Sequence, residues 1–361
     1  MILVAWFARF MAYKPGWMSY IERGYFISPF FLIDIWTRWD SNWYLTIIKQ
    51  GYVPPADISA NFSNLVFFPL YPYLIRWLAL PIHVKANSNS IYLAIGILLS
   101  NLCFLAAAYL LYKLVVELFH DETIAQRTLI LLIAFPAGFF FSAFYTESLF
   151  LLLSVATVYA AWRKRWLLAA VLCSLAAVTR SQGILLVIPM AWLYMDARQW
   201  KFRAIRPDIL YFLITPVLLV AHVVYLHYLT GDWLAMLHAE NAAGRLGSNI
   251  YGNLIQQLST VNPYVARIDI GIYLVFIAAA IYALFKFPSK GFGVYSLATL
   301  AMPILSGSWD SLSRYMVIIF PVFIILGWAA RKREIYLLLL AFFIALQAVY
   351  FTGWINYYFI A

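Results

Sequence analysis

A carboxylate set among aromatic residues is the first feature of this chain that could do chemistry. Asp40 lies between Trp39 and Trp43, and about ten residues with helical spacing of apolar positions follow it, up to Gly51. Asp is a common N-cap and Gly a common residue just past a helix end, so the pattern predicts a helix over 41–50. Asp40 is either a helix cap alone or a reactive carboxylate held at the start of that helix.

The predicted helix over 41–50 is amphipathic. Trp43, Tyr44, Ile47 and Ile48 fall on one face, and polar residues occupy the remainder. A short helix with aromatic residues near one end is typical of a membrane interface. This position would hold Asp40 at the boundary between membrane and water.

Four further ionisable residues interrupt apolar stretches. Glu147 and Arg180 each lie where two such stretches meet, and Asp310 and Arg314 lie just before another. Ionisable residues are costly inside a bilayer, which makes them candidates for function. They could instead pair with one another and only fix helix packing, and both interpretations stay open.

The composition indicates an integral membrane protein. Of 361 residues, 65% are hydrophobic and 11% charged, with a mean hydropathy of +0.83, and long apolar stretches repeat from end to end. The net charge of +10 does not indicate nucleic-acid binding, because the basic residues form short clusters between apolar segments. Cys103 and Cys173 lie inside apolar runs, so we expect neither a disulfide framework nor a metal cluster.

We predict one all-α domain over 1–361, a polytopic membrane protein with about eleven transmembrane helices. The first apolar run, 1–13, is shorter than the roughly 20 residues that a span needs. The other spans are expected near 91–117, 126–144, 147–162, 166–180, 183–195, 208–229, 269–286, 292–306, 314–330 and 335–352.

The loops between these spans alternate in charge. Short and almost purely basic loops lie at 163–165, 198–206, 286–290 and 331–333, and the positive-inside rule places them on the cytoplasmic side. The longer loops at 14–90, 230–268 and 307–313 are mixed in charge and are predicted to face outward. Asp40 and its interfacial helix lie in the first outward loop.

No nucleotide-binding motif occurs in the chain, neither G-x-G-x-x-G nor G-x-x-x-x-G-K-[ST]. An enzyme that works on the outward side has no nucleotide pool to use. If it transfers a group, we expect that group to arrive already activated on a membrane lipid.

The segment 64–76 differs from both spans and loops. Pro69 and Pro72 interrupt it too closely for a span, yet it is too apolar for a free loop. It either folds back as a re-entrant or interfacial piece against the helix over 41–50, or it is a simple amphipathic connector.

Five short motifs, taken in order, resemble those of one family. They are Arg38-Trp-Asp40 with Trp43-Tyr-Leu45 and Gly51-Tyr52, Phe67-Phe-Pro-Leu-Tyr-Pro72, Tyr145-Thr-Glu-Ser148, Thr179-Arg-Ser-Gln-Gly183 and Ser313-Arg-Tyr315. From about 36 to 325 the chain resembles the PIG-V family, the GPI second-mannose transferases and their prokaryotic relatives among the GT-C glycosyltransferases. Gln182 stands where the family pattern leads us to expect Asn.

The resemblance implies an inverting mannosyltransferase with a GT-C-like fold and Asp40 as general base. The donor would be a polyprenyl-phosphate sugar of the dolichyl-phosphate-mannose type, and the acceptor a glycolipid or glycan. A sugar hydroxyl needs a carboxylate to take its proton, and a leaving phosphate needs cationic or hydroxyl donors. Arg314 is the first candidate for the phosphate, followed by Arg180 and Tyr315. Further substrate contacts are expected from Arg38, Trp39, Trp43, Tyr44, Glu147 and Asp310.

We expect no cofactor and no metal ion. A monophosphate carries less charge than a diphosphate, and the outward segments hold no clustered carboxylates for Mg²⁺ or Mn²⁺. The expected location is the plasma membrane of a prokaryote rather than the endoplasmic reticulum, with the site on the outer or lumenal face.

Two other classes of function stay open as alternatives. A secondary transporter or lipid flippase would show paired, Gly- or Pro-broken segments in two halves, and the sequence has no such internal repeat. A non-catalytic subunit of a glycosylation complex would have the same composition as the enzyme.

Overall fold

The structure is a computed structural model, and it describes residues 1–8, 27–58, 61, 63–83, 88–242, 263–306 and 311–356. All regular elements in these ranges are helices. The α-helices are α1 (Ile2–Ala8), α2 (Phe31–Asp34), α3 (Ser41–Gln50), α4 (Leu70–Ala79), α5 (Asn89–Phe119), α6 (Glu122–Ala134), α7 (Glu147–Trp162), α8 (Trp166–Ala177), α9 (Val187–Asp196), α10 (Val217–Thr230), α11 (Ala235–Ala242), α13 (Pro263–Lys286), α14 (Gly291–Ser306), α15 (Leu312–Val317), α16 (Phe320–Ala329) and α17 (Arg333–Ile355). The 3₁₀ helices are η1 (Asn64–Val66), η2 (Leu80–Ile82), η3 (Gly138–Ser142), η4 (Ser181–Leu186), η5 (Phe202–Ala204) and η6 (Pro207–Ile214).

The helices confirm the all-α membrane-protein class. Each of the ten spans predicted after residue 90 contains a helix. Among the described residues, four helical stretches are long and apolar enough to cross a membrane: Asn89–Phe119, Pro207–Thr230, Ala266–Lys286 and Arg333–Ile355. The apolar helices α7, α8, α14 and α16 are shorter.

A proline explains why one predicted span is broken. Helix α6 ends at Ala134, and Phe135 is extended (φ −53°, ψ 143°), because the residue before a proline avoids the helical region and Pro136 follows. The chain resumes as η3, and the Phe144 N–H then donates to the Trp36 carbonyl at 3.0 Å. The break thus ties the start of α7 to the segment that carries Asp40.

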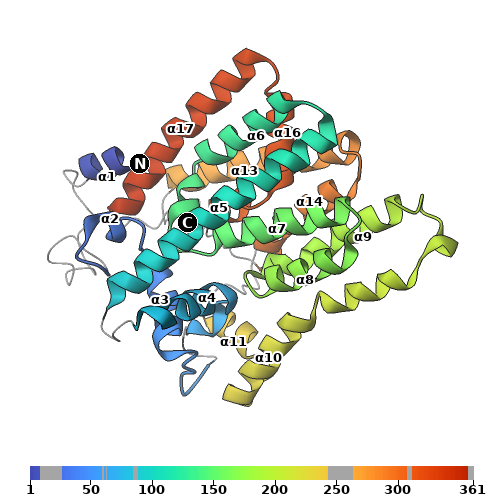
Figure 1. The fold of residues 1–361 in the computed structure, drawn as a ribbon. Helices are drawn as coiled ribbons and strands as arrows, with labels where there is room; N and C mark the ends of the chain where they lie inside the picture. The colour runs from blue at the N-terminus through green and yellow to red at the C-terminus, as the bar shows by residue number, and fades with distance from the viewer. Residues whose placement is uncertain are drawn as a thin grey trace.

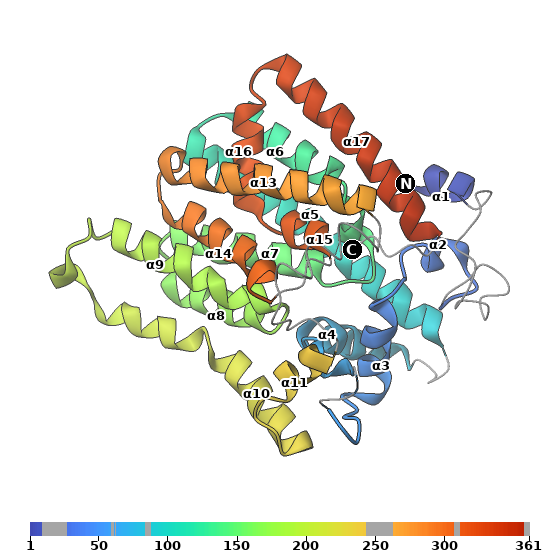
Figure 2. The same ribbon diagram turned by 180° about the vertical axis from the view of Figure 1, so that it is seen from behind.

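The helices pack around a central pair. Helix α5 runs beside α7, with α6, α13, α16 and α17 on one side and α8, α9 and α14 on the other (Figure 1). Helices α3, α4, α10 and α11 gather at one end, as the reverse view also shows (Figure 2). The lipid-facing side of α5 is recognisable because Leu98, Leu102, Leu105 and Tyr109 are exposed at helical spacing.

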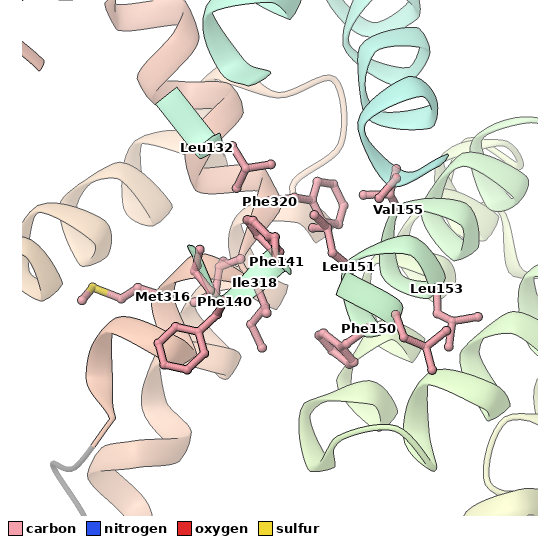
Figure 3. Packing of buried hydrophobic residues seen from close by; sticks show 14 of the residues in the cluster. Leu132, Phe140, Phe141, Phe150, Leu151, Leu153, Val155, Met316, Ile318 and Phe320 are labelled. Atoms are coloured by element: carbon pink, nitrogen blue, oxygen red, sulfur yellow. The ribbon is translucent and has the colours of Figure 1, made fainter. Parts of the chain in front are cut away.

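Aromatic packing fixes the position of α15 in the interior. Phe140 and Phe141 of η3 lie beside Met316 and Ile318, with Phe150 of α7 close by (Figure 3), and all five side chains are buried. Dense packing of this kind leaves α15 little freedom. Arg314, on the same short helix, is therefore held at a fixed place.

The segment 64–76 folds back against α3, as the first of its two interpretations predicted. Tyr44 of α3 makes edge-on contacts with Phe67 (5.2 Å between ring centroids) and Tyr71 (5.7 Å). The two prolines were expected to interrupt the segment, but they begin a helix instead. Pro69 is the N-cap of α4, and Pro72 lies in its first turn, where a missing N–H costs nothing. The segment is a short helix that begins with prolines.

One buried carboxylate in a long apolar helix was missed in the sequence. Asp269 of α13 is buried and accepts a hydrogen bond from Tyr350 Oη of α17 at 2.7 Å. A lone acidic residue in a helix of 24 residues is the expected signal of such a position. The contact links α13 to α17.

Candidate active site

Asp40 is positioned by its main chain, and its carboxylate does not cap α3. Trp39 has a left-handed φ of 51°, and Asp40 occupies the N-cap position without a side-chain capping hydrogen bond. The Asp40 N–H donates to Tyr145 Oη (3.1 Å), and that hydroxyl donates to the Arg38 carbonyl (2.9 Å). The capping interpretation is therefore wrong for the side chain of Asp40.

The Asp40 carboxylate instead begins a row of alternating charges, which we call the charged cluster. Arg314 Nη1 lies 2.7 Å from Asp40 Oδ2, and Arg314 Nε lies 2.8 Å from Glu147 Oε1. Glu147 Oε1 also pairs with Arg180 Nη1 at 2.7 Å. Two carboxylates and two guanidinium groups balance one another in this cluster.

The charged cluster is largely removed from solvent. Glu147 is fully buried, and the side chains of Arg314 and Asp40 are 9% and 15% exposed. The Arg314 guanidinium also lies over the ring of Tyr145, 4.6 Å from its centroid. Buried ion pairs repay the cost of desolvation only when their geometry is good, so each member depends on its partners to stay in place.

A small pocket adjoins the charged cluster. Its volume is about 90 Å³, and Tyr44, Arg180, Gln182, Glu240 and Tyr315 are among the residues that line it. The remaining lining residues are Val66, Phe67, Phe68, Thr146, Thr179 and Ser181. The pocket combines one guanidinium, one carboxylate and several hydroxyl groups with aromatic walls. The guanidinium and the hydroxyl groups suit a phosphate, and a carboxylate suits the hydroxyl groups of an attached sugar.

Two tyrosines beside Asp40 keep their protons. Burial raises the pKa of Tyr44, and the charge of Asp40 raises it further; the same two causes, in the same order, raise the pKa of Tyr145. Both phenols are therefore neutral and can donate hydrogen bonds near neutral pH.

The structure brings most of the predicted site residues together. Asp40, Glu147, Arg180 and Arg314 form the charged cluster, so the ion-pair interpretation of Glu147 and Arg180 holds for their geometry. Tyr44 and Tyr315 line the pocket beside them.

Other predicted residues lie elsewhere. Arg38 is buried with its guanidinium on Asp34, 2.8 Å from Oδ2, and the structure does not bring that group to the charged cluster. Trp43 stacks on Phe67 (6.2 Å), and Trp39 is half-buried. Asp310 lies outside the described residues.

Several residues of the site were not singled out in the sequence. Tyr145 links Asp40 to the Arg38 carbonyl, and Thr146 Oγ1 accepts a hydrogen bond from Arg180 at 3.1 Å. Both belong to the Tyr145–Ser148 motif, whose spacing could have suggested them. Glu240 of α11 lines the pocket from a distant part of the chain, and no local pattern marks it.

The charged cluster lies far from the basic loop at 163–165. Helix α7 has 16 residues and is therefore about 24 Å long, with Glu147 at its first position and Arg163 just past its last.

Within the described residues, no group of three His, Cys, Asp or Glu side chains is arranged to hold a metal ion. The expectation of a metal-independent reaction stays a prediction.

These features define an integral membrane protein with a buried charged site at one end of its helices. The family model for Mannosyltransferase (PIG-V) matches residues 29–237, more than half of the chain. The chain belongs to this family, and the resemblance seen in the sequence motifs is confirmed.

The relatives are GPI mannosyltransferases. The chain is 39% identical over 94 residues to GPI mannosyltransferase 2 of Yarrowia lipolytica, which is 26% of each chain. It is 30% identical over 167 residues to the Schizosaccharomyces pombe protein of that name, 46% of this chain and 32% of the relative. It is 30% identical over 151 residues to GPI alpha-1,6-mannosyltransferase 2 of Rattus norvegicus, 42% of this chain and 30% of the relative.

The matches span about a quarter to a third of the length of these relatives. All three relatives are eukaryotic, so they do not favour a prokaryotic plasma membrane over the endoplasmic reticulum. No solved structure matches the chain.

Proposed function

We propose that this chain is a membrane mannosyltransferase that moves mannose from a polyprenyl-phosphate carrier to a hydroxyl group of a glycolipid or glycan. The observation that supports this most directly is the position of the Asp40 carboxylate. It makes no capping hydrogen bond to α3, and it lies 2.7 Å from Arg314 beside the pocket. A carboxylate in such a place can accept the proton of an acceptor hydroxyl.

The reaction needs a single displacement. The acceptor oxygen forms a bond to C1 of the mannose while the bond between C1 and the phosphate oxygen breaks, so the configuration at C1 inverts. The hydroxyl proton goes to Asp40, and the lipid phosphate leaves with the electron pair of the broken bond. No enzymic nucleophile is required.

The geometry favours a different order of phosphate ligands from the one expected in the sequence. Arg180 and Tyr315 line the pocket, together with Thr146 and Gln182, whereas Arg314 is not among the lining residues. We therefore assign the donor phosphate to Arg180 and Tyr315, and we assign Arg314 to hold Asp40 through its link to Glu147.

We also propose a GT-C-like architecture with about eleven spans and with the charged cluster on the outward face. This orientation is supported by the length of α7, which separates Glu147 from the basic loop that begins at Arg163.

The orientation can be tested by cysteine labelling. Exposed positions Ala56 and Ala204 offer a matched pair of cysteine substitutions, since both native cysteines are buried. An impermeant thiol reagent should label Ala56→Cys and spare Ala204→Cys in intact cells, and the reverse pattern would refute the orientation.

The function is tested with purified protein, synthetic polyprenyl-phosphate mannose and a mannose-terminated glycolipid. We expect the donor to be consumed and the new linkage, read by NMR, to have the opposite anomeric configuration to the donor. Movement of intact donor across vesicles without bond cleavage would instead support a flippase. No turnover without a partner protein would support a non-catalytic subunit.

A further inference from the structure

A second and larger pocket lies at the opposite end of the molecule from the charged cluster. It has a volume of about 730 Å³ and is formed by the loop after α7, the loop after α9 and the start of η6. Figure 1 shows the loop after α9 at the edge of the molecule opposite α1 and α2. We call it the basic pocket, and its lining residues are Lys164, Trp166, Ala197, Arg198, Gln199, Lys201, Arg203, Ala204, Ile205, Arg206 and Asp208.

The charge of the basic pocket is unbalanced. Its lining holds five cationic side chains and one carboxylate, Asp208. Both oxygens of Asp208 are engaged by Arg198 Nη2, at 2.9 and 2.8 Å. The other four cations, Lys164, Lys201, Arg203 and Arg206, have no ion pair with any described residue.

The basic pocket has a well-defined framework in addition to its surface charges. The Arg198 side chain is 10% exposed, its guanidinium lies 3.4 Å from the centroid of the Tyr194 ring, and its buried Nε has no hydrogen-bond partner among the described residues. Gln199 and Trp200 both have left-handed φ values, 52° and 57°. Such backbone costs energy, and here it bends the loop around the cavity.

Apolar side chains alternate with the cations at the rim. Trp200 and Phe202 are 48% and 75% exposed, on either side of Lys201 and next to Arg203. Exposed aromatic residues interleaved with Lys and Arg are typical of a segment that meets lipid headgroups with its cations and acyl chains with its rings.

We propose that the basic pocket binds the headgroup of an anionic phospholipid from the leaflet at this end of the protein. A lipid phosphate would supply the negative charge that the lining lacks, and basic pockets between membrane helices suit such headgroups. The exposed rings of Trp200 and Phe202 favour a lipid over a free anion, because a free anion has no acyl chain for them to contact.

The test compares two triple variants of the whole chain in neutral detergent. Lys201→Gln/Arg203→Gln/Arg206→Gln alters the basic pocket, and Arg331→Gln/Lys332→Gln/Arg333→Gln removes the same charge from an exposed basic loop outside it. Phosphatidylglycerol, relative to phosphatidylcholine, should raise the Tm of the unaltered protein by about 2–4 °C. The pocket variant should lose this rise, and the loop variant should keep it.

Native mass spectrometry gives a second readout, the number of phosphatidylglycerol molecules retained, which does not depend on the melting behaviour of a variant. Retention should fall in the pocket variant alone. An unchanged Tm rise and retention in the pocket variant, or an equal loss in both variants, would overturn the proposal. So would an equal Tm rise with millimolar inorganic phosphate, because that would make the site one for free anions.

Discussion

At the Glu147 end of α7 the charges are buried and balanced, whereas at the Trp162 end they are mostly exposed and mostly positive. The charged cluster pairs two carboxylates with two guanidinium groups, and the basic pocket sets five cations against one carboxylate. Buried groups must neutralise one another because desolvation penalises any excess charge. Exposed groups remain hydrated and do not incur that penalty, so they can carry an excess of positive charge that is available to bind a ligand.

This difference in charge indicates different roles: the charged cluster positions reacting groups, and the basic pocket binds a ligand. In the charged cluster each side chain is held by its neighbours, so a small change should disturb the geometry of reacting groups. In the basic pocket four of the five cations are exposed and only Arg198 is largely buried and paired, so changes to the exposed four should alter ligand affinity and leave the core intact. The variants below test the cluster against matched positions elsewhere.

The largest effect is expected from Asp40→Asn. The amide cannot take the proton of the acceptor hydroxyl, so mannose transfer should fall by about 10²–10⁴-fold. The Asp40 side chain makes no capping bond, so the start of α3 should be kept. The Tm should fall by less than in Glu147→Gln, because Asp40 pairs with one arginine and is partly exposed, whereas Glu147 pairs with two and is fully buried. The control is Asp121→Asn, because Asp121 caps α6 through Thr123 N at 2.8 Å and Asn caps about as well as Asp.

Turnover and Tm are measured on the same preparations of both variants. A stable Asp40→Asn protein that transfers mannose at nearly the normal rate would refute the general-base assignment. Equal losses of activity in both variants would show that the assay reports damage to the fold.

The next effect is on stability and concerns Glu147→Gln. This change removes the carboxylate that Arg180 and Arg314 share and leaves them with Asp40, which pairs with Arg314 alone. Breaking a buried pair in this way costs about 3–5 kcal/mol. Glu117→Gln is the matched control at the other end of α7, since its pair with Arg163 at 3.2 Å is partly exposed and should be worth no more than about 1 kcal/mol. Denaturant unfolding of the two variants should differ accordingly, and similar losses would contradict the contrast between the two ends.

A smaller effect should separate the two arginines of the cluster. Arg180→Lys should raise the KM for the donor by about 10-fold, because a point charge replaces a guanidinium fork on the phosphate. Arg314→Lys should lower kcat and leave that KM nearly unchanged, because Lys has no fork to hold Asp40 and Glu147 at once. If Arg314→Lys alters only the donor KM, the phosphate lies on Arg314, as the sequence alone suggested.

Local patterns in the sequence were sufficient to predict the helices and the members of the charged cluster. Apolar periodicity located ten helical segments, and the rarity of charge in them drew attention to Glu147, Arg180 and Arg314. Pairing among Glu147, Arg180 and Arg314 was one of the two interpretations left open. The part taken by Asp40 could not be predicted, because its contact with Arg314 joins distant parts of the chain. The environment of Arg38 was missed for a different reason. Its partner Asp34 lies only four residues away, a spacing typical of a local ion pair, and that pair was overlooked in the sequence.

The effect most remote from the chemistry is expected at the end of α3, the helix that begins beside Asp40. Gly51 has φ 81° and ψ −159°, a region that is open almost only to glycine and costs other residues about 1–3 kcal/mol. A Cβ at this position would meet no atom within 4 Å, so any loss of stability in Gly51→Ala reports backbone strain alone. The control is Gly271→Ala inside α13, where an added Cβ also meets nothing and alanine should stabilise the helix by about 0.5–1 kcal/mol. Opposite shifts of Tm are therefore expected from the same added methyl group. A rise in both variants would mean that α3 does not end in the conformation described, and the positioning of Asp40 by the main chain around α3 would need revision.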